Sequence, residues 1–138
     1  MEFSPGLRGV VAGETSISTV GKEGTSLRYR GYDATDLTKN NTYEQVASLI
    51  IADSLNDKDF RKSFAKYYLE ISKDQKINDL LSEIKQTLHP MDVIRTVVSY
   101  KGELTTLRKQ QLDKEDKTEL SARINATVCY IIASYHEE

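Results

Sequence analysis

The chain has 138 residues, of which 38% are hydrophobic and 29% charged, and its formal net charge at pH 7 is −2. This length suits one domain with a real core, and the near balance of charge gives no reason to expect a nucleic acid or an anionic membrane as partner. A single cysteine, Cys129, excludes an internal disulfide and a zinc site built from several cysteines.

The numbers of cysteines and histidines and the lengths of the apolar runs also limit the compartment, membrane insertion and metal binding. One cysteine and no recognisable secretory signal favour the cytoplasm. The longest apolar runs, residues 46–52 and 128–133, are too short to span a membrane. With only two histidines in the chain, we predict no metal site.

Residues 4–35 form a glycine-rich region that holds six of the seven glycines. Two short β-prone pieces, residues 17–20 and 27–29, flank a glycine-containing turn at 21–24, which predicts a β-hairpin. Because a lone hairpin is only marginally stable in water, we expect it to pack on something larger.

Residues 42–138 have a helical period. Thr42 and Gln45 have the spacing of a capping box ahead of a first helix. Asn56 or Asp57 is expected to cap a second helix. The apolar side of that second helix is predicted to be core and consists of Phe60, Phe64, Tyr67, Tyr68 and Ile71.

Three more helices are predicted beyond this point. Apolar spacing indicates one near residues 77–88, and Pro90 is expected to start the next, which ends near Gly102. Residues 105–117 are expected to be a solvated connection. The last helix is predicted to begin near Thr118, with Cys129 as a small buried apolar residue. Its expected buried face consists of Leu120, Ile124, Val128, Ile131 and Tyr135.

Two ordered sequence blocks carry a family resemblance. The glycine-rich block at residues 7–33 and the block His-Pro-Met-Asp-Val-Ile-Arg-Thr at residues 89–96, with Val98 and Ser99, closely resemble bacterial citrate synthases and 2-methylcitrate synthases. The chain departs from the pattern at Lys101, where relatives more often have a small or apolar residue. The implied fold is mainly α: residues 1–138 would be the N-terminal, incomplete part of the large domain, with a β-hairpin region followed by about five helices.

The resemblance also implies an activity. Family members are homodimers that condense an acyl-CoA thioester with oxaloacetate and then hydrolyse the thioester, with CoA entering as substrate and no permanently bound cofactor. Their two catalytic histidines and one aspartate lie beyond the segment that this chain resembles. We therefore expect no catalytic residue in this chain, and no activity from it alone. The acetyl or propionyl preference depends on pocket residues outside it.

Two basic residues are candidate ligand contacts by resemblance. Arg8 matches an arginine that lies near the CoA phosphates in relatives, and the alternative is an exposed arginine on an N-terminal arm. Lys66 falls near a basic position that approaches substrate, although a solvated helix face explains it as well. Arg28 and Arg30 are expected to share one face of a strand, where they would form framework salt bridges or, as the alternative, meet an anionic ligand.

The remaining motif residues are expected to be structural. Gly31 permits a tight bend and Asp33 caps the short helix after it. His89 sets the entry geometry of the helix that Pro90 begins, and the carboxylate of Asp92 is favoured by the free N–H groups of the first turn. His136 has no assigned role.

Two hypotheses for the chain follow. By resemblance, helices at 90–101 and 118–136 correspond to the family's dimer interface, so their apolar faces would be uncovered in this segment. The chain is then expected to be aggregation-prone, loosely packed or dependent on a homodimer mate or a complementing C-terminal half. The alternative is a non-catalytic helical interaction module, a relic that pairs with a synthase subunit.

Overall fold

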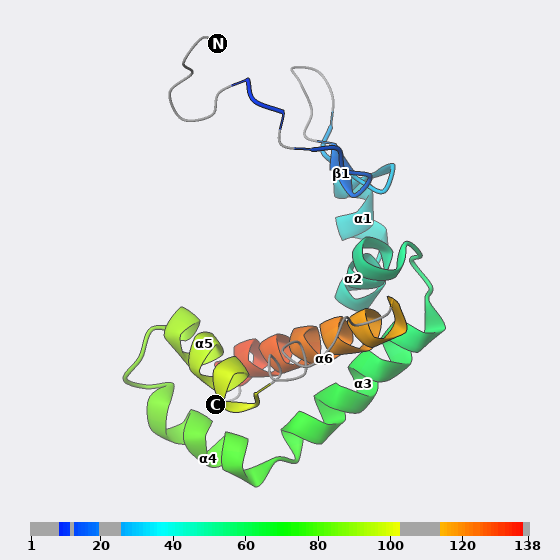
Figure 1. Cartoon of the computed structure of the whole chain (residues 1–138). Helices are drawn as coiled ribbons and strands as arrows, with labels where there is room; N and C mark the ends of the chain where they lie inside the picture. The colour runs from blue at the N-terminus through cyan, green and yellow to red at the C-terminus, as the bar shows by residue number, and fades with distance from the viewer. Residues whose placement is uncertain (1–8, 12, 20–25, 103–113, 137–138) are drawn as a thin grey trace. The chain divides into compact units, whose positions relative to one another are not determined.

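The structure is a computed structural model, and it describes residues 9–11, 13–19, 26–102 and 114–136. The chain divides into two compact units, residues 1–40 and 41–138. Within these ranges the protein is mainly α-helical, with six helices and three short strands (Figure 1).

The first unit is built on a small antiparallel sheet. Strands β1 (Ser18–Thr19), β2 (Arg28–Tyr29) and β3 (Tyr32–Asp33) lie in the order β1-β2-β3. Ser18 pairs with Tyr29 across β1 and β2, which confirms the predicted pairing of the two β-prone pieces. The glycine turn at 21–24 lies outside the described residues.

The turn between β2 and β3 corrects one expectation. Arg30 does not continue the strand beside Arg28, because it has a φ of 49° and Gly31 a φ of 87°. Two consecutive positive φ values are the signature of the tight two-residue hairpin turn that matches strand twist. Arg30 Nη1 donates to Ser16 Oγ at 2.7 Å, so it braces the turn from the side.

Helix α1 (Ala34–Asn40) follows β3 directly. Asp33 Oδ1 accepts from the N–H groups of Thr35 at 2.8 Å and Asp36 at 3.3 Å, which satisfies two donors that lack intrahelical partners. Leu37 is buried on this helix. The predicted cap is thus the junction between the sheet and α1.

The second unit begins with two capped helices. Helix α2 (Tyr43–Ala52) has the complete Thr42–Gln45 capping box, and α3 (Lys58–Ser72) is capped by Asp57, which accepts from the Phe60 N–H at 2.8 Å. Both helices were predicted, and Asp57 rather than Asn56 is the cap.

Helix α4 (Gln75–Ile84) is shorter than predicted, because it ends four residues before Leu88. The Leu88 N–H bonds back to the Ile84 carbonyl in a terminal turn, and its side chain is exposed. Helix α5 (Pro90–Tyr100) starts at the expected proline, and Gly102 follows it with a φ of 63°. The predicted end of α4 was therefore too late, because Leu88 fits the apolar spacing but lies beyond the helix and faces solvent.

Helix α6 (Lys114–Ala133) differs from prediction in its start and in its buried face. It begins at Lys114, inside the stretch expected to be a solvated connection, whose earlier part lies outside the described residues. Of the five residues expected on its buried face, only Ile131 is fully buried. The other fully or nearly buried positions of this helix and its end are small: Ala122, Ala126, Thr127 and Ser134.

Two apolar clusters hold the second unit together, and α6 takes part in both. One joins the end of α3 with α4, α5 and α6 through Ile71, Ile77, Leu81, Val93, Val97 and Ile131. The other joins α2, α3 and α6 through Ala47, Phe60, Phe64, Ala122 and Ala126. Helix α6 lies alongside α3 (Figure 1), and small side chains on α6 leave room for the phenyl rings of α3.

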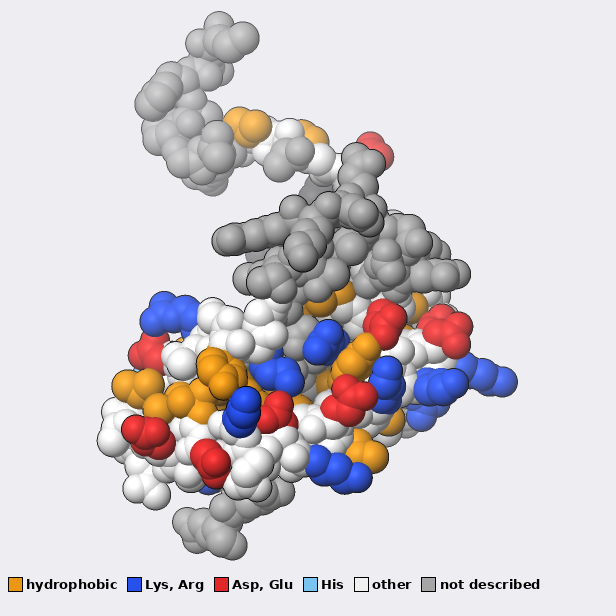
Figure 2. All heavy atoms as spheres, turned by 60° about the horizontal axis from the view of Figure 1, so that its bottom comes forward, with side chains coloured by type: hydrophobic (Ala, Val, Ile, Leu, Met, Phe, Trp, Pro, Cys, Tyr) orange, Lys and Arg blue, Asp and Glu red, His pale blue; other side chains and the backbone are white. Residues whose placement is uncertain are grey.

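The face of the molecule drawn in Figure 2 carries charged side chains of both signs and apolar side chains. Figure 2 shows Lys and Arg side chains interspersed with Asp and Glu, with apolar side chains exposed between them. Large apolar residues exposed near α5 and on α6 are Leu88, Met91, Tyr100 and Ile132. No helix among the described residues is long and apolar enough to cross a membrane.

Candidate functional site

An open groove of about 930 Å³ lies between α2, α3 and α6 in the second unit. Its apolar lining comes from Tyr43 on α2, from Phe64, Tyr68 and Leu69 on α3, and from Cys129 on α6. The rings of Tyr43 and Phe64 are 6.2 Å apart, and those of Phe64 and Tyr68 are 6.3 Å apart. These separations are typical of packed aromatic pairs, so the lining is a continuous aromatic surface.

Tyr43 connects the groove to α6. Its hydroxyl donates to Asn125 Oδ1 at 2.6 Å and lies beside the thiol of Cys129. Partial burial and the neighbouring Cys129 raise the pKa of Tyr43 to about 12. Partial burial also raises the pKa of Cys129. Cys129 was expected to be a buried apolar residue, but it is only half-buried and lines the groove. Neither group is activated as a nucleophile at neutral pH.

The charged lining of the groove is unbalanced. Arg61 and Lys62, both exposed on α3, face one half-buried carboxylate, Glu44 on α2. Neither cation forms an ion pair within the part of the chain that the structure describes. The groove therefore combines an aromatic surface with a small excess of positive charge.

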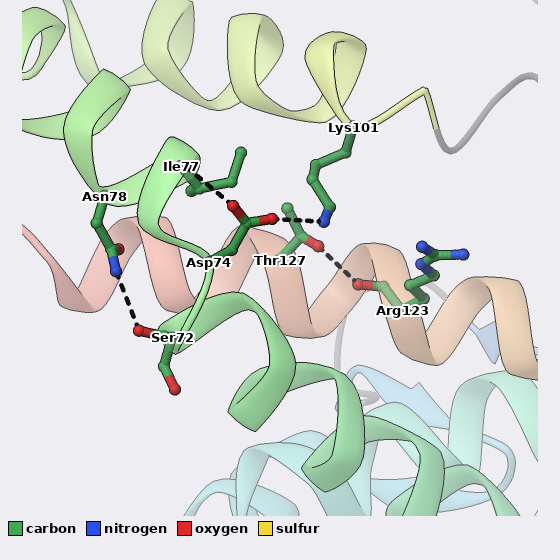
Figure 3. A network of polar contacts seen from close by, with 7 residues as sticks. All are labelled: Ser72, Asp74, Ile77, Asn78, Lys101, Arg123 and Thr127. Atoms are coloured by element: carbon green, nitrogen blue, oxygen red, sulfur yellow. Dashed lines mark hydrogen bonds and ion pairs between the residues drawn. The ribbon is translucent and has the colours of Figure 1, made fainter.

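A second polar feature ties α5 to the start of α4. Asp74 Oδ1 accepts from the Ile77 N–H at 3.3 Å as the cap of α4, and its other oxygen receives Lys101 Nζ at 3.1 Å (Figure 3). Asn78 donates to the Ser72 carbonyl at 3.1 Å and accepts from the Tyr130 hydroxyl at 2.6 Å. The α3–α4 corner is thus bonded to both α5 and α6.

Asp74 is predicted to make stability depend on pH through Lys101. Partial burial opposes its ionisation, but the hydrogen bonds from Lys101 and Ile77 outweigh burial and lower the pKa of Asp74. A lowered carboxyl pKa contributes stability above the unfolded value of about 3.9, and this stability is lost as pH falls through the folded pKa.

Replacement Lys101→Met should therefore lower the free energy of unfolding by about 1 kcal/mol at pH 7, because the pair is partly exposed. The deficit should shrink as pH falls below about 4. Urea unfolding of both proteins across this range tests the pair. A deficit that stays constant down to the lowest pH would assign the effect of Lys101 to packing alone.

The block at residues 89–96 forms a helix start. His89 Nδ1 accepts from the Met91 N–H at 3.2 Å, and Pro90 occupies the first helical position, where its missing N–H has no consequence. Asp92 lies in the first turn and pairs with Arg95 at 2.7 Å. His89 is exposed, and its hydrogen bond explains its position without a catalytic role.

The candidate ligand contacts fare differently. Arg8 lies outside the described residues. Lys66 is exposed on α3, 4.0 Å from Glu70 Oε1, and its ammonium group is 4.9 Å from the centroid of the Tyr67 ring. The Tyr67 hydroxyl donates to Glu119, and this hydrogen bond with partial burial raises the pKa of Tyr67 to about 12. Lys66 belongs to this charged surface, and not to the lining of the groove.

Within the described ranges, no group of three or more His, Cys, Asp or Glu residues is placed to hold a metal. The sequence did not point to the groove or to the Asp74–Lys101 pair. Asp74 had a local signal, a capping residue three positions before Ile77. Nothing local could have connected Tyr43 with Cys129, because their elements are far apart in sequence.

Comparison with known proteins identifies the family of this chain. The family model described as "Citrate synthase, C-terminal domain" matches residues 6–138. A 2-methylcitrate synthase of Shewanella oneidensis is 36% identical over 136 residues, which are 96% of this chain and 36% of the relative. A 2-methylcitrate synthase of Mycobacterium tuberculosis is 36% identical over 102 residues, covering 73% of this chain and 26% of the relative.

A citrate synthase of Heyndrickxia coagulans is 30% identical over 139 residues, covering 98% of this chain and 36% of the relative. The chain therefore spans about a third of the length of the relatives that it matches. Both sequence blocks, with the helix start at His89 and the turn at Gly31, fall within the matched residues. This chain belongs to the citrate synthase family.

Proposed function

We propose that this chain is the framework portion of a citrate or 2-methylcitrate synthase. Such an enzyme condenses acetyl-CoA or propionyl-CoA with oxaloacetate and hydrolyses the resulting thioester. The observation that carries the proposal is the match over residues 6–138 to the family, combined with relatives named for both activities. The single cysteine supports a reducing compartment, and we place the enzyme in the cytoplasm.

The chemistry asks for groups that the described part of this chain does not assemble. Removal of a proton from carbon next to a thioester needs a base within hydrogen-bond reach and a partner for the developing oxyanion. His89 is committed to capping α5, and Tyr43 and Cys129 have raised pKa values. We infer that the catalytic histidines and aspartate come from the part of the enzyme that this chain does not span.

The contribution of this chain is then structural, with one ligand contact. Arg8 is proposed to meet the CoA phosphates, because a guanidinium can donate two parallel bonds to a phosphate. The apolar residues exposed near α5 and on α6, such as Met91 and Ile132, support a homodimer interface or a complementing half. Lys66 is left with a role on the solvated face of α3.

The proposal predicts no thiol release by the chain alone from acetyl-CoA or propionyl-CoA with oxaloacetate. Release should appear when the chain replaces the matching segment of the Shewanella oneidensis relative in a full-length chimera. A thiol-reactive dye that absorbs on release of CoA measures both. Activity of the chain alone would place the chemistry here, and a folded chimera without activity would contradict the framework role.

The second candidate is a non-catalytic helical module that pairs with a synthase subunit. The groove and the exposed apolar residues favour it as much as they favour the first proposal. The two proposals differ in one expected outcome. A helical module would bind an intact synthase and change the rate of that enzyme. A framework portion would not bind an intact synthase, because the matching segment of that enzyme already occupies its position.

A further inference from the structure

We propose that the groove between α2, α3 and α6 is covered by an amphipathic helix with acidic residues, which belongs to the part of the synthase that this chain does not span. This inference rests on the proposed function, since it names the partner of that framework. The proposed occupant is a protein segment, which is supported by the shape and charge of the groove and by the length of the relatives.

The shape of the groove suits a helix. Ala65 and Leu69 are four residues apart on α3 and therefore lie on one face of that helix, and both are exposed. Leu69 is 54% exposed and Tyr43 across the groove is 53% exposed, although both are large and apolar. The small side chain of Ala65 leaves a hollow beside Leu69 and Tyr68. A row of this kind accepts the apolar ridge of a second helix.

The charge of the groove selects the occupant. The lining holds two positive charges, on Arg61 and Lys62, and one negative charge, on Glu44. Neither Arg61 nor Lys62 forms an ion pair with another residue in the described ranges. A helix with Asp or Glu beside its apolar stripe would pair with them, and a basic helix would be repelled. Complementary charge also fixes the position of the helix along α3.

The length of the relatives supplies the candidate. This chain matches 36% of the Shewanella oneidensis enzyme, so nearly two thirds of that protein is available to pack against it. Helix α6 already fills the adjacent side of α3, where Phe60 and Phe64 meet Ala122 and Ala126. The groove is an open side of this three-helix contact among the described residues.

Cys129 provides a direct reporter, because it is the only cysteine of the chain and lines the groove. Alkylation by iodoacetamide at pH 9, followed by peptide mass spectrometry, is measured in the free chain and in the chimera with the Shewanella oneidensis enzyme. Covering the groove should slow alkylation of Cys129 in the chimera by about tenfold or more, since reaction then requires local opening.

Two matched variants locate the protection. In the chimera, Leu69→Asp should restore most of the reactivity, because a carboxylate would be buried against the covering helix. Leu27→Asp, at an exposed leucine of the first unit that lines neither the groove nor the apolar surface near α5, should leave the protection in place. Equal loss in both variants, or loss in neither, would overturn the assignment.

The remaining outcomes separate this inference from the proposed function. A chimera that releases thiol while Cys129 stays as reactive as in the free chain overturns the groove assignment only. Protection without thiol release supports the groove and contradicts the proposed activity, and reactive Cys129 in an inactive chimera counts against both. Protection in the free chain that grows with its concentration would show that a second copy occupies the groove, which also overturns the inference.

Discussion

Replacement of Phe60 by alanine is expected to lower the free energy of unfolding by about 3–5 kcal/mol. The Phe60 side chain is fully buried, at 0% exposure, and packs with Ala47 of α2 and with Ala122 and Ala126 of α6. Its removal would leave a cavity where three helices meet, one turn after the Asp57 cap that accepts from the Phe60 N–H. Urea unfolding followed by circular dichroism measures the change.

The same helix provides the control for this prediction. Leu69→Ala removes a comparable apolar side chain that is 54% exposed, so it should cost about 1 kcal/mol or less in the isolated chain. Similar losses for both variants would contradict a core centred on Phe60. The comparison also shows whether the chain alone holds the packing of α2, α3 and α6.

Helix starts were predictable because the bonds that form them are local. Thr42 and Gln45 are three residues apart, Asp57 bonds to the Phe60 N–H, and His89 precedes Pro90 directly. Each of these signals needs only the residues within one turn, and tertiary contacts do not override it. The sequence therefore located the starts of α2 and α5 to the residue, and left two adjacent candidates, Asn56 and Asp57, for the cap of α3.

Buried faces were less predictable because burial depends on the neighbour. Leu88 is apolar and correctly spaced, yet α4 ends before it and the side chain meets solvent. In α6 the predicted face used the large residues, such as Leu120 and Ile124, which are half-buried. The buried residues of α6 are small because the rings of α3 fill the space between α3 and α6.

The candidate site also has features that local sequence could predict and features that depend on tertiary contacts. The family could be recognised from two blocks of sequence, since each block preserves its residues in order. The groove could not, because Tyr43, Phe64 and Cys129 come from three helices and meet only after folding. Lys101 stood out as a departure from the family pattern, and the structure supplies its partner, Asp74, 27 residues earlier in the chain.

The small residues of α6 lead to the second large prediction. Ala126→Leu should lower the free energy of unfolding by about 3 kcal/mol, at the upper end for overpacking, although leucine is a good helix former. Ala126 is at 0% exposure in the cluster with Phe60 and Phe64, so three added carbons must push α6 away from α3. The thermal midpoint and the urea midpoint should both fall.

Ala65→Leu is the matched control, because it makes the same change at an exposed position of α3. Its effect on the isolated chain should stay within about 0.5 kcal/mol, as expected for a surface substitution. If Ala126→Leu were equally harmless, the contact between α3 and α6 would have to be loose enough to admit the added atoms. The phenyl rings of α3 would then not explain why the buried residues of α6 have small side chains. The contrast between the two alanines therefore tests whether close packing against the phenyl rings of α3 is what keeps the buried face of α6 small.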